Sequence, residues 1–527
     1  MAADSRGEQI FKEWVFPRAI DIACDAVSTQ MDAVVKSLST AKSISKITPE
    51  FLRAWSLNNN VVEPADQVAS DVVKILFSAI NTERGLSKNK KKTSDTALYS
   101  IIGQLASRRS QNCSDFSGPM TLFWWKNGAS RESLEVLQNL GLSKCFDSAQ
   151  TMVDSVADYC IDAARVEAQT PNGFMGNWDN VNISTSDFVE QRSGGPAKVQ
   201  SGTYAILYRL RNPNPRAMTL GSLLARAEAT PNLDFNNDVC PTLAQSIGTY
   251  CNFRAYVVRV FFRYTKGFDT EYSKHPAFQP IPRRALPDDY VTKQFPVRLS
   301  TIEENSIPGN LAVHEDVFAI RAFDMNPFLR AQVFQLGIGL FHLCLNLIWA
   351  ILQSHRGHET TEGSLAYFFV ILEKARLGGK HPDYHSLLAA FMQILDGLLL
   401  DSWRLECGSP TLAAFAASKP TDEQILAIAD RILADRATPD RSLSTTPVDD
   451  INANTRKLVH DLLHVAEVTR AISAGDFGRV EDLLGNLAMI FRGAGSKNYC
   501  TEILYFIHNL KYVWKGDGFE CVRSYHD

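Results

Sequence analysis

One stretch of the sequence places a carboxylate and two side-chain amides where an apolar segment gives way to a polar one: Trp178-Asp179-Asn180-Val181-Asn182-Ile183. Nucleases and transposases of the ribonuclease H kind hold two metal ions with a cluster of carboxylates, which stabilise the attacking and the leaving oxygen. Asp179 is a candidate first acid of such a cluster, and Glu373 and Asp401, each predicted on a later helix, are candidates for a later member. The alternative is that Asp179 and Asn180 cap a helix or form a turn.

Histidines offer a second possible metal chemistry. The segment His460-Asp461-Leu462-Leu463-His464 is similar to the zinc-protease motif His-Glu-x-x-His, with aspartate in place of glutamate. The shorter side chain would set the general base back by a methylene, and no third ligand is evident, so the sequence disfavours this site. His381 and His385 stand four residues apart, a spacing that can put two ligands on one helix face. Pro382 indicates a helix start or a loop instead, which favours surface histidines beside an N-terminal cap.

Nucleic-acid binding would depend on a local patch. The chain has 54 basic and 58 acidic residues and a net charge of −4, without the basic excess of a dedicated nucleic-acid binder. The candidate patch consists of Lys88, Lys90, Lys91 and Lys92. Phe123-Trp124-Trp125-Lys126 could add rings that stack on bases. The alternatives are a solvated loop for the lysines and packed core for the tryptophans.

Cysteine usage and the N-terminus indicate an intracellular protein, nuclear or cytoplasmic. None of the ten cysteines forms a Cys-x-x-Cys pair, and the first residues lack the apolar core of a secretory signal. We therefore expect free, mostly buried thiols. Residues 331–354 contain no Asp, Glu, Lys or Arg and are long enough to cross a bilayer. Their polar residues, His342 among them, favour a buried helix, and nothing else in the sequence resembles a span.

The elements that must position these residues are mainly helical. Hydrophobic periodicity predicts a helical region over 1–170, a mixed α/β region with a Pro-rich connector over 171–310, and a helical region over 311–527. In the middle region, Gly202 to Leu210 alternates as a strand does, whereas Arg254 to Tyr264 suits either a strand or a buried helix. The predicted fold class is α+β, predominantly α-helical, with a few strands in the middle region.

Several motifs occur in one order along the chain and together carry a family resemblance. They are Trp178 to Ile183, Gln200-Ser201-Gly202-Thr203, Pro296 to Glu304, Leu340-Phe341-His342-Leu343 and Gly495-Ser496-Lys497-Asn498-Tyr499. With them the chain resembles a large fungal family of uncharacterised proteins, domain-of-unknown-function family six-five-eight-nine. The resemblance implies many copies per genome and mobile-element ancestry, without an assigned reaction.

The chain departs from that family pattern in two places. More complete members resemble one another in a Gly-Asp-Gln segment between the counterparts of Asp316 and Phe341, and this segment is missing here. The family also continues with further helix where this chain ends. The resemblance therefore implies an incomplete copy without the second acid of a metal site. We expect poor coverage of Leu504, Phe506 and Ile507, and marginal stability.

These observations favour a mobile-element-derived protein without retained catalysis, acting through binding if at all. One alternative is a metal-dependent ribonuclease H-like transposase or nuclease, and another is a helical scaffold for protein–protein interaction. No cofactor is expected except a divalent metal under the nuclease alternative. The sequence identifies no partner, although DNA is one candidate, and it leaves the oligomeric state open; no membrane association is expected.

Overall fold

The computed structural model describes residues 5–39, 43–88, 95–170, 174–184, 199–211, 220–268, 272–304, 306–319, 337–439 and 450–514. The chain packs into two compact units. Unit 1 comprises Met1–Thr170, Gly176–Tyr208 and Gln294–Phe323, and unit 2 comprises Pro171–Met175, Arg209–Lys293 and Asp324–Asp527. The fold is α+β and predominantly helical, which confirms the predicted class. The three regions drawn from the sequence stay a prediction.

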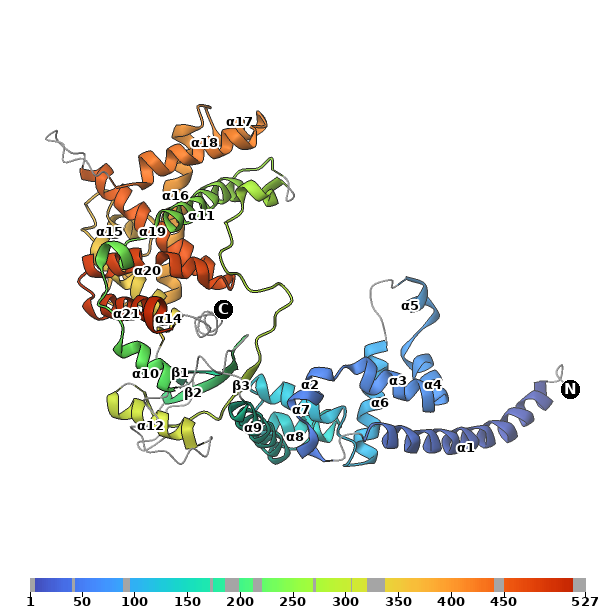
Figure 1. The fold of residues 1–527 in the computed structure, drawn as a ribbon. Coiled ribbons are helices and arrows are strands. Elements are labelled where there is room, and N and C mark those ends of the chain that lie inside the picture. Colours follow the sequence, from blue (N-terminus) through green and yellow to red (C-terminus); the bar gives the residue numbers. More distant parts are fainter. Residues whose placement is uncertain are drawn as a thin grey trace, which may run out of the picture. The chain divides into compact units, whose positions relative to one another are not determined.

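Unit 1 is a helical array that ends in a small sheet (Figure 1). Its helices are α1 (Ser5–Ser37), α2 (Pro49–Ala54), α3 (Glu63–Val68), α4 (Ser70–Ile80), α5 (Glu83–Lys88), α6 (Asp95–Arg109), α7 (Ser117–Lys126), α8 (Arg131–Asn139), α9 (Phe146–Gln169) and α12 (Ile307–Ala319). The C-terminal part of α1 packs on α3, α4 and α6 through buried Met31 and Val34, and Leu38 directly after the helix joins the same core. Thr48 caps α2 and Ser130 caps α8 through their hydroxyl groups, each accepting a backbone N–H.

The sheet consists of β1 (Phe174–Ser184), β2 (Val199–Arg209) and β3 (Gln294–Pro296), in the order β1-β2-β3. Strand β2 confirms the alternating pattern that begins at Gly202, and it pairs with β3 antiparallel. Gly202 lies where a Cβ atom would collide with the carbonyl of Ser300, so this close backbone approach requires glycine. Thr203 and Ser300 exchange two backbone hydrogen bonds of 2.9 and 2.8 Å, which join two of the sequence motifs.

Unit 2 is a helical bundle with one extensive apolar core. Its helices are α10 (Leu220–Glu228), α11 (Leu243–Tyr264), α14 (Leu340–His355), α15 (Leu365–Ile371), α16 (Tyr384–Glu406), α17 (Leu412–Ala417), α18 (Asp422–Ile432), α19 (Asp450–Ser473), α20 (Phe477–Gly493) and α21 (Lys497–His508). Arg254 to Tyr264, which the sequence left open, belongs to α11 and is therefore helix. The N-terminus of α11 carries a full capping box between Thr242 and Gln245.

Two helices bear on the membrane question. Helix α14 covers the described C-terminal part of the uncharged stretch, and its Leu347 and Ile351 are fully buried, as expected for a core helix. Helix α16 is the one described helix that is long and apolar enough to span a bilayer, and half of its apolar window is buried in unit 2. The expectation that nothing else in the sequence resembles a span was therefore wrong.

Some expectations about burial fail. Phe506 and Ile507 of α21 are 2% and 5% exposed, because they pack into the apolar core of unit 2, so the predicted bare surface is wrong for these two residues. The nine cysteines within the described ranges are free, as expected, but only four of them are buried. His342 is exposed at the start of α14 and is not a core histidine. Phe123 and Trp125 are 54% and 41% exposed on α7, so they are not packed core.

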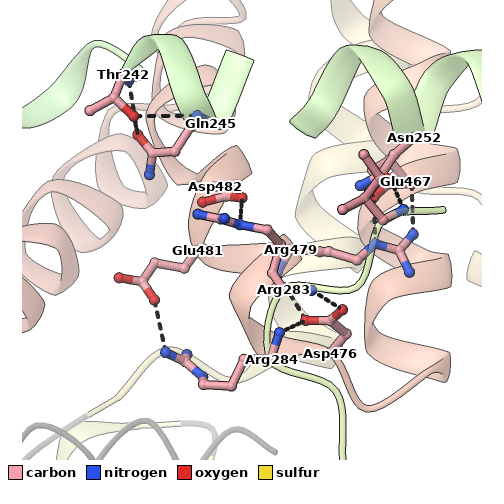
Figure 2. A network of polar contacts seen from close by, with 11 residues as sticks. Thr242, Gln245, Asn252, Arg283, Arg284, Glu467, Asp476, Arg479, Glu481 and Asp482 are labelled. Carbon is pink, nitrogen blue, oxygen red and sulfur yellow. Dashed lines mark hydrogen bonds and ion pairs between the residues drawn. The ribbon is translucent and has the colours of Figure 1, made fainter. Parts of the chain in front are cut away.

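A polar network fixes the connector 279–286 on helix α20 (Figure 2). The Asp476 carboxylate, at the N-cap of α20, accepts the backbone N–H groups of Arg283 and Arg284 at 2.9 and 2.8 Å. Deeper in the core, the Arg479 guanidinium donates two hydrogen bonds of 2.8 Å to the carboxylate of Glu467 on α19. This ion pair is nearly inaccessible to solvent and joins α19 to α20.

Candidate metal centre

Helix α19 brings two imidazoles and a carboxylate together on one side. His460, Asp461 and His464 offer ligand atoms that all lie within 4.8 Å of one another, and within the described residues this is the one such group of three or more. Positions i and i+4 of a helix share a face, which explains why His460 and His464 meet. Their ring centroids are 4.6 Å apart. The apolar neighbours Leu462 and Leu463 are buried and anchor this helix in the core.

His464 is a buried imidazole with an unused lone pair. Its Nδ1 lies 2.9 Å from the His460 carbonyl oxygen, which can only accept, so Nδ1 carries the proton. Its Nε2 is therefore an acceptor, and this atom is buried without a hydrogen-bond partner among the residues that the structure describes. Burial lowers the pKa of His464 to about 4, so the ring is neutral at pH 7. Neutral imidazole with a free nitrogen is the form that binds a metal ion.

Asp461 is held in place by two histidines. Its Oδ2 atom accepts from Nε2 of His355 at 2.8 Å, and its Oδ1 atom accepts from Nδ1 of His460 at 3.3 Å. Burial alone would raise the pKa of the Asp461 carboxyl, but these hydrogen bonds and the attraction to both rings outweigh it and lower that pKa below its usual range. Because Nδ1 of His460 donates, its Nε2 atom keeps a lone pair. The group thus contains two imidazole acceptors and one anionic carboxylate.

The sequence missed the residue that completes this cluster. His355 ends α14 and stands 106 residues before Asp461, so no local spacing connects them. The structure brings them into contact because α14 packs against α19 in the core of unit 2. The motif around His460 was visible but was set aside for want of a third group. His381 and His385 gave the expected result: Asp383 caps α16, and both histidines are exposed.

The cluster opens into a cavity of about 720 Å³ formed by α14, α19 and α20, which we call the α14/α19/α20 cavity. Its lining residues are Ser354, His355, Pro439, Asn454, Lys457, His460, Asp461, His464, Asn486, Met489, Ile490 and Gly493. Helices α14 and α20 both reach this cavity with their last turns. The carbonyl end of a helix carries partial negative charge, so both helix ends favour a cation here.

The carboxylates proposed from the sequence are not part of this centre. Asp179 lies in β1, not in a loop or helix cap, and its Oδ1 atom accepts the backbone N–H of Asn180 at 2.8 Å. It belongs to a strand because β1 pairs with β2 in the sheet, and Ser201 on β2 also donates to Asn182 on β1 at 2.7 Å, a contact between two separate motifs. Asp179 is in unit 1, whereas the other two candidate acids are in unit 2.

Glu373 and Asp401 lie in a helix-ending turn and on an exposed helix face, respectively. Glu373 was predicted on a helix but follows α15 with a φ of 56°, because the helix ends there in a left-handed turn closed by the Lys374 N–H and the Phe369 carbonyl. Asp401 is on a helix, α16, as predicted, and forms an exposed ion pair of 2.8 Å with Arg404. Neither joins the group of ligand atoms around His464. Their catalytic roles, and that of Asp179, stay predictions.

The lysine patch falls largely outside what can be described. Helix α5 ends at Lys88, and Lys90, Lys91 and Lys92 lie outside the described residues. The place of the absent Gly-Asp-Gln segment, between Asp316 and Phe341, also lies mostly outside them. Neither the basic patch nor the loss of that segment is tested by the structure.

Comparison with known proteins finds a similarity in the C-terminal part of the chain to a family without an assigned activity. A family model described as "Family of unknown function (DUF6589)" matches residues 316–523. The matched segment contains His355, Asp461 and the whole α14/α19/α20 cavity, whereas the motifs on β1, β2 and β3 precede it. No curated protein and no solved structure matches the chain. The chain is therefore similar, over its C-terminal part, to a domain family of unknown function.

Proposed function

We propose that unit 2 binds one divalent metal ion, zinc, through His460, Asp461 and His464. The observation that carries this proposal is the Nε2 atom of His464: it is a buried lone pair with no partner in the described part of the chain, next to a second imidazole and a carboxylate. A histidine that served only as core packing would leave that acceptor unsatisfied, at a cost of about 1–3 kcal/mol. A bound metal ion removes this cost.

The ligand chemistry favours zinc. Imidazole nitrogen and carboxylate oxygen suit Zn²⁺, whereas Mg²⁺ and Ca²⁺ prefer oxygen ligands alone. Zinc bonds of about 2.0–2.2 Å in a tetrahedron separate the ligand atoms by about 3.4 Å. The present separations of up to 4.8 Å therefore require only small side-chain rotations. His355 would hold the Asp461 carboxylate from outside the ligand set, as second partners of metal ligands commonly do.

The site has the composition of an open zinc centre. Closed structural sites use four protein ligands, whereas three protein ligands leave one coordination position for water or a substrate. Zinc in such a position supplies a bound water with a pKa near 7 and polarises carbonyl or phosphoryl oxygens. The α14/α19/α20 cavity provides the space in front of the three ligands.

This proposal is separate from those that the family resemblance implied. A fungal source, mobile-element ancestry and loss of catalysis stay proposals, as does an intracellular location. The ribonuclease H-like alternative needs a cluster of carboxylates that includes Asp179, whereas the zinc centre uses two histidines and one aspartate from α19. Loss of the Gly-Asp-Gln segment therefore does not affect the zinc centre.

Metal binding to the purified full chain tests the proposal. The protein is stripped with a chelator, and zinc affinity is then measured by competition with a chromogenic chelator. We expect one zinc per chain and at least about 100-fold weaker binding for His464→Gln and for His460→Gln, because each removes one ligand. The matched control His385→Gln changes an exposed histidine of α16 and should bind as the parent does.

Two results would overturn the proposal: no stoichiometric zinc in the parent protein, or equal affinity in all three variants. Circular dichroism of each variant shows whether unit 2 is folded. His460→Gln is the safer variant, because the His460 side chain is 36% exposed and its replacement creates no buried cavity.

A further inference from the structure

The polar lining of the α14/α19/α20 cavity consists largely of hydrogen-bond donors. Apart from the metal centre, the polar side chains that line it belong to Ser354, Asn454, Lys457 and Asn486. Among the residues that the structure describes, none of these four has a hydrogen-bond or ion-pair partner. They can offer one ammonium, two amides and one hydroxyl to a ligand. Ser354, Asn454 and Lys457 are exposed to solvent, so their donors are accessible to a ligand that carries acceptors.

The positions of these residues make the lining a single surface. Asn454, Lys457, Asp461 and His464 follow one another on α19 at spacings of three, four and three residues, which places them along one helix face. Asn486 comes from α20 and Ser354 from the last turn of α14. The donors therefore surround the cavity from three helices, with the metal centre among them.

The charges point to an anion. Lys457 is the one cationic side chain among the lining residues, and Asp461, which belongs to the metal centre, is the one carboxylate. With zinc bound, the metal's two positive charges and that of Lys457 exceed the charge of Asp461 and the partial charges of the two helix ends. Lysine is a common phosphate binder, acting as a point charge.

The size and the apolar wall point to an organic ligand. A cavity of about 720 Å³ is within the range of about 300–1,000 Å³ found for small-molecule sites and is far larger than one phosphate group. Met489 and Ile490 of α20, together with Pro439, supply apolar surface beside the donors. An ester whose phosphate meets the metal and Lys457 could place its organic part on this wall.

Resting on the proposed zinc centre, we propose that the α14/α19/α20 cavity binds a small organic phosphate ester. One phosphate oxygen takes the open coordination position of the metal, and the other oxygens accept hydrogen bonds from Lys457 and its neighbours. The proposal assigns Lys457 a binding role that does not involve holding the metal.

The experiment uses the full chain loaded with cobalt, whose visible absorption reports changes in coordination. Inorganic phosphate, phenyl phosphate and acetate are titrated separately. We expect phenyl phosphate to bind more tightly than inorganic phosphate, because its ring meets Met489 and Ile490, and both to bind more tightly than acetate. Lys457→Met should weaken phenyl phosphate binding at least about 10-fold, as loss of one charge-assisted hydrogen bond does, with metal affinity unchanged.

The possible negative results distinguish an error in the zinc centre from an error in the ligand class. If the parent protein takes up no metal, the zinc centre itself is wrong. If the metal binds but neither phosphate changes the absorption, or acetate binds as tightly as phenyl phosphate, the ligand class is wrong and the metal centre stands. Lys497→Met, at an exposed lysine on α21 outside the cavity, is the matched control. Equal losses in both lysine variants would overturn the role of Lys457.

Discussion

The buried ion pair between Glu467 and Arg479 allows a quantitative test of what holds α19 and α20 together. Their side chains are 2% and 4% exposed, and two hydrogen bonds of 2.8 Å join them (Figure 2). Asn252 of α11 donates a third hydrogen bond, of 2.9 Å, to Glu467. Removing one partner leaves the other charge buried and unpaired, so Glu467→Leu and Arg479→Met should each lower the free energy of unfolding by about 3–5 kcal/mol.

The double variant shows whether the ion pair itself adds to stability, or whether each charge only prevents the cost of leaving the other unpaired. When both charges are replaced by apolar side chains, no unpaired charge remains, and such replacements are often neutral. The Asn252 amide then loses its acceptor, which costs about 1–3 kcal/mol. We therefore expect the double variant to be more stable than either single variant.

Urea unfolding of the full chain, followed by far-ultraviolet circular dichroism, measures these free energies. The transition of unit 2 should move, whereas that of unit 1 should not, because all three residues belong to unit 2. Arg404→Met, which breaks the exposed pair with Asp401, is the control and should change stability by less than about 1 kcal/mol. Additive losses in the double variant, or single losses as small as that of the control, would refute the reasoning.

Three further predictions concern the glycine contacts, the metal and a buried tyrosine. Gly485→Ala should destabilise unit 2 by at least about 1–3 kcal/mol, because the added Cβ atom would collide with the backbone carbonyl of Val239. The control Gly493→Ala has open space around the added atom and should leave stability unchanged in the same urea assay. Zinc at 100 times its dissociation constant should stabilise unit 2 by about 2.7 kcal/mol and raise its melting temperature, and a chelator or His464→Gln should abolish the rise. Burial and the hydrogen bond to Asp66 raise the pKa of Tyr99 to about 12, so the folded state holds this proton more tightly than the unfolded chain. The contribution of Tyr99 is intact below pH 10 and is lost as pH rises from 10 to 12; if Tyr99→Phe loses stability over that range as steeply as the parent, this assignment is wrong.

The local elements could be predicted where one signal dominated. Leu483, Leu487 and Phe491 repeat at helical spacing and are fully buried in α20, which ends at Gly493. For the segment that forms α11, the sequence did not decide between strand and helix, because its aromatic and β-branched residues suit both. The spacing of Thr242 and Gln245 is that of a capping box, so the sequence already indicated that a helix begins there.

The site could be predicted only in part, because its decisive contact is not local. His460 and His464 stood out by their spacing, but their motif lacked a third group in the sequence. The third ligand of the proposed centre is Asp461, which the motif comparison assigned to the general base. His355, which holds Asp461, reaches it only through the packing of α14 on α19. The position of Asp179 in a strand, and not in a helix cap or turn, was unpredictable for the same reason: it depends on the pairing of β1 with β2, across residues that no short motif connects.

The position of the orphan nitrogen on α19 strengthens the metal proposal. His464 and Glu467 are three residues apart, so one turn of the helix carries both the unpaired acceptor and the most completely buried ion pair described here. Packing on Phe253, with ring centroids 5.0 Å apart, restrains the His464 ring further. A rigid helix cannot easily turn this nitrogen toward another donor, so its unsatisfied state persists until a ligand arrives. Held by such a scaffold, the lone pair beside His460 and Asp461 is prepared for a metal ion at the edge of an open cavity.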